Sequence, residues 1–265
     1  MSTAALLAPL TAAPASAGAA IRPAATIDGP STDIAELGGV AMAPDGSGGI
    51  VYLKRVGGIP HVFAAAYRGG RWTAPMQVDG GQPFAASWPR IAAGNGGRLL
   101  VVWATTWALL NGKPEQELLS SFLATGSAVF GPAHFVDADV REGSGLEPSL
   151  VMNAAGQALC TYRVITNPLI GAQPPIPRLR PNDDQAEVRL ARFNGSDSWS
   201  GLGPQNRNTA ISSRAPAEGN GPEVGIGADG NGVIAWQEPD VSGAARIFAR
   251  RVFGGGIGPD RKSVV

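Results

Sequence analysis

Hydrophobic positions recur in the same alternating pattern in four segments of the chain, each fifteen residues long. Counted from its first residue, each segment carries an aliphatic residue two positions on, a glycine eight positions on and a large aromatic fourteen positions on. The segments are GGVAMAPDGSGGIVY from Gly38, PRIAAGNGGRLLVVW from Pro89, PSLVMNAAGQALCTY from Pro148 and PEVGIGADGNGVIAW from Pro222. Self-similarity at this scale is the sequence signature of a repeat architecture.

The alternation within each copy predicts a β-hairpin. Apolar side chains two positions apart, such as Val40 and Met42, describe a strand with one buried face. The shared glycine follows turn-forming residues such as Asp45 and Asp229, and this pair suits the backbone of a tight turn. The second strand ends on an aromatic column, which comprises Tyr52, Trp103, Tyr162 and Trp236. We predict that each of these aromatics packs against the neighbouring copy.

Each copy continues with a third strand and, in two copies, with a short fourth one. The third strands are predicted at 62–67, 118–123, 188–193 and 247–252, and the fourth strands at 76–79 and 134–137. Four short strands per copy are typical of propeller blades. The predicted fold is therefore all-β, a β-propeller-type array of four-stranded antiparallel blades. It is one domain, 22–265, with repeats near 38–88, 89–147, 148–221 and 222–265.

Composition agrees with this architecture and excludes several others. The 265 residues include 37 Gly and 22 Pro, an excess that excludes a helix bundle. Lys plus Arg (21) equals Asp plus Glu (21) and only 16% of residues are charged, so we expect no nucleic-acid partner. A hydrophobic content of 44% supports a sizeable core and excludes wholesale disorder.

The first 21 residues differ from the rest. They carry no charged side chain, and a weak apolar stretch precedes the small-x-small pattern of residues 15–17. This is similar to the later part of a secretory signal peptide without its basic beginning, and the alternative is a disordered tail rich in Ala, Pro and Ser. No other segment has the roughly 18 consecutive apolar residues of a transmembrane helix, so none is predicted. We therefore expect an extracellular or cell-surface location.

The sequence leaves open how the array ends. Residues 23–28 are predicted to form an extra fourth strand, because Asp28 precedes the first repeat by ten residues, as Asp79 precedes Pro89. This strand either closes a ring on the last blade or belongs to a preceding blade of a larger ring. An incomplete or open arrangement is the third alternative, although an open row leaves exposed edges that proteins usually avoid.

The repeat pattern and the turn Gly69-Gly70-Arg71-Trp72-Thr73-Ala74-Pro75 resemble secreted bacterial β-propellers of the sialidase-like superfamily. The resemblance covers residues 22–265 and implies one activity, glycoside hydrolysis by an arginine triad, a tyrosine nucleophile paired with a glutamate, and an acidic general acid. The chain departs from that pattern. Tyr52 and Tyr162 occupy the packing column, the Asp-box Ser-x-Asp-x-Gly-x-x-Trp is reduced to a loose echo at 194–199, and no arginine is assignable to a triad.

No catalytic residue, metal site or cofactor is predicted. The two histidines, His61 and His134, lie near no nucleophile motif and lack the spacing of metal ligands. Cys160 falls in an apolar column of the repeat, which indicates a core residue rather than a reactive thiol. The Asp-Gly turns lack the spaced carboxylates and the bidentate glutamate of a calcium loop.

Two copies lengthen the link between their second and third strands, at 104–116 and at about 166–184. Long loops are often functional, and insertions at the same point of a repeat emerge on the same face. This predicts a binding surface for sugar or peptide, with the candidate residues Trp107, Arg178, Arg180, Asp183 and Asp184. The alternative is a solvated, proline-stiffened loop without a ligand.

The predicted function is a non-catalytic, secreted or cell-surface binding or scaffold module with a glycan or protein ligand. Two alternatives remain open: a sialidase-like glycoside hydrolase, and a structural repeat segment of a longer surface protein.

Overall fold

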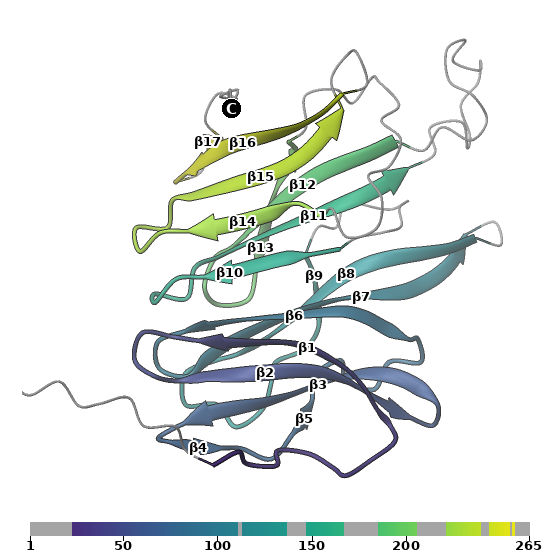
Figure 1. The fold of residues 1–265 in the computed structure, drawn as a ribbon, viewed down its shortest axis with the longest axis vertical. Helices are drawn as coiled ribbons and strands as arrows, with labels where there is room; N and C mark the ends of the chain where they lie inside the picture. Colours follow the sequence, from purple (N-terminus) through teal and green to yellow (C-terminus); the bar gives the residue numbers. More distant parts are fainter. Residues whose placement is uncertain are drawn as a thin grey trace, which may run out of the picture.

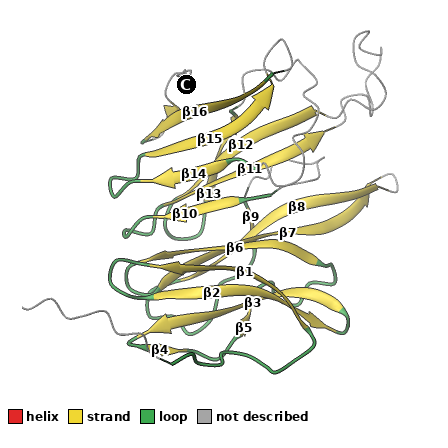
Figure 2. Cartoon of the chain, in the orientation of Figure 1, coloured by secondary structure: helices red, strands yellow, loops and turns green. Residues whose placement is uncertain are grey.

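The computed structural model describes residues 23–110, 113–136, 147–166, 185–205, 221–239, 244–254 and 256–257. Every regular element in these ranges is a β-strand, so none of them is a helix able to span a membrane (Figures 1 and 2). The strands form four antiparallel sheets, each built from consecutive stretches of the chain. The predicted all-β array of antiparallel blades is confirmed.

The first sheet consists of β1 (Ile34–Met42), β2 (Gly48–Val56), β3 (Ile59–Arg68), β4 (Arg71–Trp72) and β5 (Met76–Gln77), the last two both pairing with β3. The second consists of β6 (Ala86–Gly94), β7 (Arg98–Leu110), β8 (Lys113–Leu123) and β9 (His134–Phe135). The third consists of β10 (Ser149–Met152), β11 (Ala158–Thr166), β12 (Gln185–Phe193) and β13 (Trp199–Pro204). The fourth consists of β14 (Glu223–Ile226), β15 (Gly232–Pro239), β16 (Ala245–Phe253) and β17 (Gly256–Ile257).

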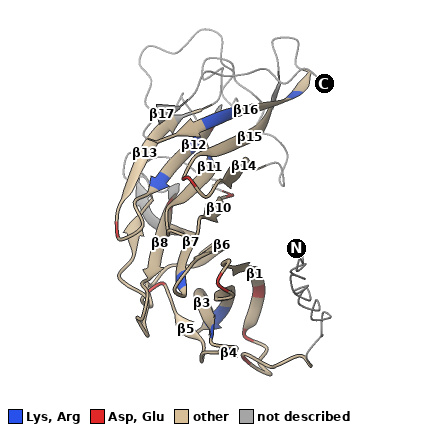
Figure 3. Cartoon of the chain, turned by 90° about the vertical axis from the view of Figure 1, so that its left-hand side faces the viewer, with Lys and Arg blue, Asp and Glu red and all other residues tan. Residues whose placement is uncertain are grey.

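The four sheets stack face to face in sequence order and form a curved row (Figures 1 and 3). Their first strands meet along the row, since β1 contacts β6, β6 contacts β10 and β10 contacts β14. Within the described ranges the row stays open, with no closed ring. Of the arrangements that the sequence left open, the described residues therefore form the open one.

The aromatic column is buried, and three of its four members lie in core clusters shared by two sheets. Its four side chains are between 0% and 3% exposed. Trp103 shares a core cluster with Val51 and Leu53 of the first sheet, and Trp236 shares one with Leu159 of the third. Trp103 and Trp236 therefore pack on the preceding sheet, as predicted, whereas no described sheet precedes that of Tyr52. Burying an aromatic of this size removes roughly 200 Å² from water and contributes about 5 kcal/mol.

The hairpin turns join neighbouring sheets at one end of the row's first strands, which we call the turn end. The turn glycines Gly46, Gly97, Gly156 and Gly230 all have positive φ. The carboxylate of Asp45 accepts a hydrogen bond from the Gly96 amide of the next sheet at 2.6 Å. The Arg98 guanidinium likewise donates to the Ala155 carbonyl of the third sheet at 2.8 Å. The turns thus bond one sheet to the next.

Residues 23–28 do not form the extra strand that the sequence predicted. The fourth sheet, on which such a strand would close a ring, lies at the other end of the open row (Figure 1). The segment is held by side chains instead: Tyr52 donates its hydroxyl to Asp28 at 2.6 Å, and the Lys54 ammonium lies 2.9 Å from the same carboxylate. These two bonds lower the pKa of Asp28, while burial and this carboxylate raise the pKa of Tyr52.

The link predicted at 104–116 is not a loop. β7 runs to Leu110 and β8 begins at Lys113, so the two strands extend as one long hairpin with a bulge after Thr106. The β-branched and apolar residues after Trp103 favour strand over loop. The prediction failed because it assumed strands of equal length in every copy.

Two buried polar or reactive groups belong to the fold. The Asp79 carboxylate lies 2.9 Å from the His61 ring and accepts the Val62 amide at 3.0 Å, which ties the end of the first sheet back onto β3. Cys160 is fully buried, as predicted, and burial raises the pKa of its thiol. A thiol in such surroundings is a poor nucleophile.

Candidate functional site

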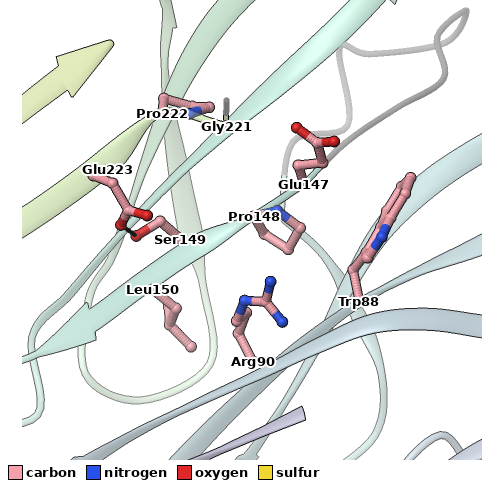
Figure 4. Close-up of a pocket in the computed structure, with 9 residues that line it drawn as sticks. All are labelled: Trp88, Arg90, Glu147, Pro148, Ser149, Leu150, Gly221, Pro222 and Glu223. Atoms are coloured by element: carbon pink, nitrogen blue, oxygen red, sulfur yellow. Dashed lines mark hydrogen bonds between the residues drawn. The ribbon is translucent and has the colours of Figure 1, made fainter. Parts of the chain in front are cut away.

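A cavity of about 560 Å³ lies near the beginning of the first strands of the second, third and fourth sheets. This end of the strands, opposite the hairpin turns, is called the start end below. Figure 4 shows Trp88 on one side of the cavity and the Ser149–Glu223 pair on the other. Of the residues that the structure describes, nine line it: Trp88, Arg90, Glu147, Pro148, Ser149, Leu150, Gly221, Pro222 and Glu223.

The lining residues occupy equivalent positions in three successive copies. The position before the repeat's first proline holds Trp88, Glu147 and Gly221, and the position after that proline holds Arg90, Ser149 and Glu223. The prolines are buried, so one backbone pattern is repeated three times along the row. The fold thereby brings an aromatic, a cation, a hydroxyl and two carboxylates to one cavity.

The backbone at the start end is strained at two of these positions. Trp88 and Glu147 have φ values of 48° and 33°, and each directly precedes a proline. Among the described residues they are the only two outside glycine with positive φ. The ladder between β6 and β7 is also bulged between Ser87 and Arg90. Such conformations cost about 1–3 kcal/mol each and cluster at functional sites, where they aim side chains.

A buried ion pair fixes Glu147. The Arg163 guanidinium lies 3.1 Å from its carboxylate, and Arg163 is only 4% exposed. Arg163 follows the aromatic of the third copy, where the other copies have Leu53, Ala104 and Gln237. A buried guanidinium needs an anionic partner to offset its desolvation. The third copy therefore carries a buried charge, Arg163, that the other copies lack, and this charge contacts the cavity residue Glu147.

Two further contacts orient polar groups around the cavity. The Ser149 hydroxyl donates to a Glu223 carboxylate oxygen at 2.7 Å and links the third sheet to the fourth. One N–H of Arg90 donates to the Pro89 carbonyl at 3.0 Å. This bond orients the guanidinium. It uses one of the five N–H donors that a guanidinium carries.

The cavity offers hydrogen-bond donors, acceptors and a flat aromatic surface, but no metal cluster. Among the residues that the structure describes, no three His, Cys, Asp or Glu side chains are grouped to hold a metal ion. A smaller cavity of about 280 Å³ lies near the outer strands of the second and third sheets. There the Trp199 indole donates to the Ser120 hydroxyl at 2.8 Å, a contact that joins the two sheets.

The described residues that line the cavity were not among those predicted to bind ligand. Arg178, Arg180, Asp183 and Asp184 lie outside the described residues, and Trp107 lies in β7 at the bulge, its side chain likewise outside the description. Sequence reasoning missed the cavity residues because it treated the positions beside each first proline as connecting residues. The available signal was that these positions differ between copies while their neighbours are alike.

No protein-family model and no curated protein matches the chain. Several solved structures are similar in fold. A protein of unknown function from Dyadobacter fermentans is 12% identical with a TM-score of 0.51, covering 88% of this chain and 70% of its own. An α-L-arabinanase of Penicillium chrysogenum is 12% identical at 0.49, covering 91% and 70%.

A Hadza microbial sialidase is 12% identical with a TM-score of 0.48, over 80% of this chain and 43% of its own. The chain therefore spans less than half the length of that sialidase. These likenesses concern the fold alone, which is also the level at which the sequence resembles the sialidase-like propellers.

Proposed function

We propose that this protein is a carbohydrate-binding module whose site is the cavity at the start end. The observation that carries the proposal is the cavity's lining: an indole, a guanidinium and two carboxylates from three consecutive sheets surround one space. A sugar ring has an apolar C–H face and an edge of hydroxyl groups. An indole covers the apolar face, while carboxylates accept from hydroxyls and a guanidinium donates to them.

Size and preorganisation support the proposal. A volume of about 560 Å³ is within the usual range of small-molecule sites and suits a short oligosaccharide. Glu147 is fixed by Arg163, and Glu223 by Ser149, before any ligand arrives. Side chains that are already ordered lose little entropy on binding, so such a site binds more tightly than a flexible one.

Binding without catalysis is favoured over hydrolysis. A hydrolase needs one carboxyl group free to donate a proton and another free to attack or to activate water. Here the described carboxylates of the cavity are engaged, one with a buried arginine and the other with a serine. Hydrolysis of the sialidase type is distinguished from binding by the glycoside assay below.

The test is glycan capture by the purified protein on an array of neutral and acidic oligosaccharides, followed by titration calorimetry with the best ligand. Trp88→Ala and Glu223→Gln are expected to weaken binding by about tenfold or more each. Trp72→Ala is the matched control, because it removes an indole that packs on Tyr67 in the first sheet, away from the cavity. Circular dichroism checks that each variant is folded.

Three results would contradict the proposal: capture of no glycan, capture unaffected by Trp88→Ala and Glu223→Gln, or equal loss in Trp72→Ala. If the protein hydrolyses fluorogenic glycosides and Glu223→Gln abolishes this activity, the function is hydrolysis rather than binding.

On the signal-peptide-like pattern of residues 1–21, we also propose that the module works outside the cell or on its surface. Detection of the protein only in the cytoplasm of its native host would contradict this.

A further inference from the structure

The first sheet exposes apolar side chains that the repeat buries elsewhere. Val40 and Met42 of β1 are 66% and 55% exposed. Their equivalents in the second copy, Ile91 and Ala93, are both 7% exposed, because they lie in the core cluster formed with the first sheet. We call the surface formed by Val40 and Met42 the leading face.

The fourth sheet exposes the complementary set. Val233 of β15 is 46% exposed, whereas its equivalents Leu100 and Leu159 are 0% exposed. Ile247 of β16 is 59% exposed, whereas its equivalents are buried: Val62, Leu118 and Val188. We call the surface formed by Val233 and Ile247 the trailing face.

The internal interfaces show what each of these faces contacts. Leu100 shares a core cluster with Leu150 and Met152 of the next sheet. In the same way Leu159 shares a cluster with Val224 and Ile226 of the fourth sheet. Leu150 and Val224 are equivalent to Val40, and Met152 and Ile226 to Met42. In both interfaces the residue equivalent to Val233 packs on the residues equivalent to Val40 and Met42. Val233 itself therefore matches a surface like that of Val40 and Met42.

We propose that the trailing face of one molecule binds the leading face of a second copy of this chain. Each molecule carries one face of each kind, so the contact continues the interface that already joins its own sheets. Exposed apolar surfaces of this kind mark association sites. A head-to-tail contact forms closed rings or open fibres, and the curvature of the row favours rings (Figure 3).

The proposal is independent of the sugar site. The cavity lies at the start end of the second, third and fourth sheets, and neither Val40, Met42, Val233 nor Ile247 lines it. Glycan binding and self-association can therefore fail separately.

The test is sedimentation velocity of the whole chain over a range of protein concentrations. Wild type is expected to associate in a concentration-dependent manner. Val40→Asp and Val233→Asp are each expected to weaken association by about a hundredfold or more, since each would bury an unpaired carboxylate. Val129→Asp is the matched control, because Val129 is 68% exposed in a turn outside both faces and should associate like wild type.

Mixing the two variants makes the test specific. Val40→Asp retains a trailing face and Val233→Asp retains a leading face, so an equimolar mixture should form heterodimers and nothing larger. A wild type that stays monomeric at every concentration would overturn the proposal. So would association abolished by Val40→Asp but unchanged by Val233→Asp, which is the result for a contact between two leading faces. Circular dichroism of each variant excludes misfolding as the cause.

Discussion

The first strands of the four sheets have similar residues at the turn end in every copy, but different residues at the start end. At the turn end the copies are alike: a glycine with positive φ, and bonds to backbone groups of the next sheet, as from Asp45 and Arg98. At the start end the copies differ, with Trp88, Glu147 and Gly221 at one position. Backbone contacts hold the row together at one end, while side chains vary around a cavity at the other.

In this repeat, a position that is alike in all copies and one that differs between copies have different roles. Positions that are alike in all copies satisfy the requirements of the hairpin and the interface, which every blade shares. Positions that differ between copies, and that adjoin a fixed residue, are free of those requirements. In a stacked row, such positions from consecutive copies lie next to one another and can form a site.

The largest expected effect is at the start end, where Arg163→Ala should lower the free energy of unfolding by about 3 kcal/mol or more. It leaves Glu147 without its partner in a largely buried place. Ligand binding should weaken at the same time, because Glu147 lines the cavity. Urea denaturation and calorimetry measure the two effects. Arg98→Ala, at the turn end, is the control and should cost less than about 1 kcal/mol with ligand binding unchanged.

If Arg163→Ala lowered the free energy of unfolding no more than Arg98→Ala, the ion pair between Arg163 and Glu147 would not stabilise the fold. The two ends of the strands would then not differ in their contribution to stability.

A smaller effect is expected at the turn end from Gly46→Ala, with a loss of about 1–2 kcal/mol. The φ of Gly46 is 80°, which an alanine adopts only at a cost, although nothing lies within 4 Å of the added methyl group. Ligand affinity should stay unchanged. Gly225→Ala in β14 is the matched control, since its surroundings are equally open and its φ is not positive. Equal destabilisation by both would show that conformation at the turn is not the cause.

The smallest effect concerns pH. Hydrogen bonds from Ser47 and from the Gly96 amide hold the pKa of Asp45 below its ordinary 3.8. The unfolded chain binds this proton more readily, so the stabilisation is present above pH 3.8 and is lost as pH falls through the folded value. Asp45→Asn should therefore be less stable than wild type at neutral pH, with a difference that shrinks in acid.

Asp229 provides the comparison for that measurement. Its pKa is lowered by Asn231 of its own turn, and in the described part of the chain its sheet is the last of the row. Denaturation curves at several pH values should show a smaller change for Asp229→Asn than for Asp45→Asn. An equal change would mean that the bond between sheets adds nothing to the bond within the turn.

Much of the fold could be predicted from the sequence because its determinants are local and repeated. The repeat position of Gly156 specifies a hairpin turn in each copy, and the repeat position of Tyr162 specifies a buried aromatic. The site could not be predicted, because Trp88, Glu147 and Glu223 are separated by 59 and 76 positions and meet only when the sheets stack. The length of β7 was missed for a related reason, since a repeat does not specify how far a strand extends.

The linear order of the sheets has a consequence for how the molecule opens. Among the described residues, the main contacts between sheets join consecutive neighbours only. Stability in such an array is a sum of nearest-neighbour terms, so unfolding can begin at either end without disturbing the middle. The amide hydrogens of β7 and β11, which have sheets on both sides, should be the last to exchange with solvent deuterium, and those of β16 among the first.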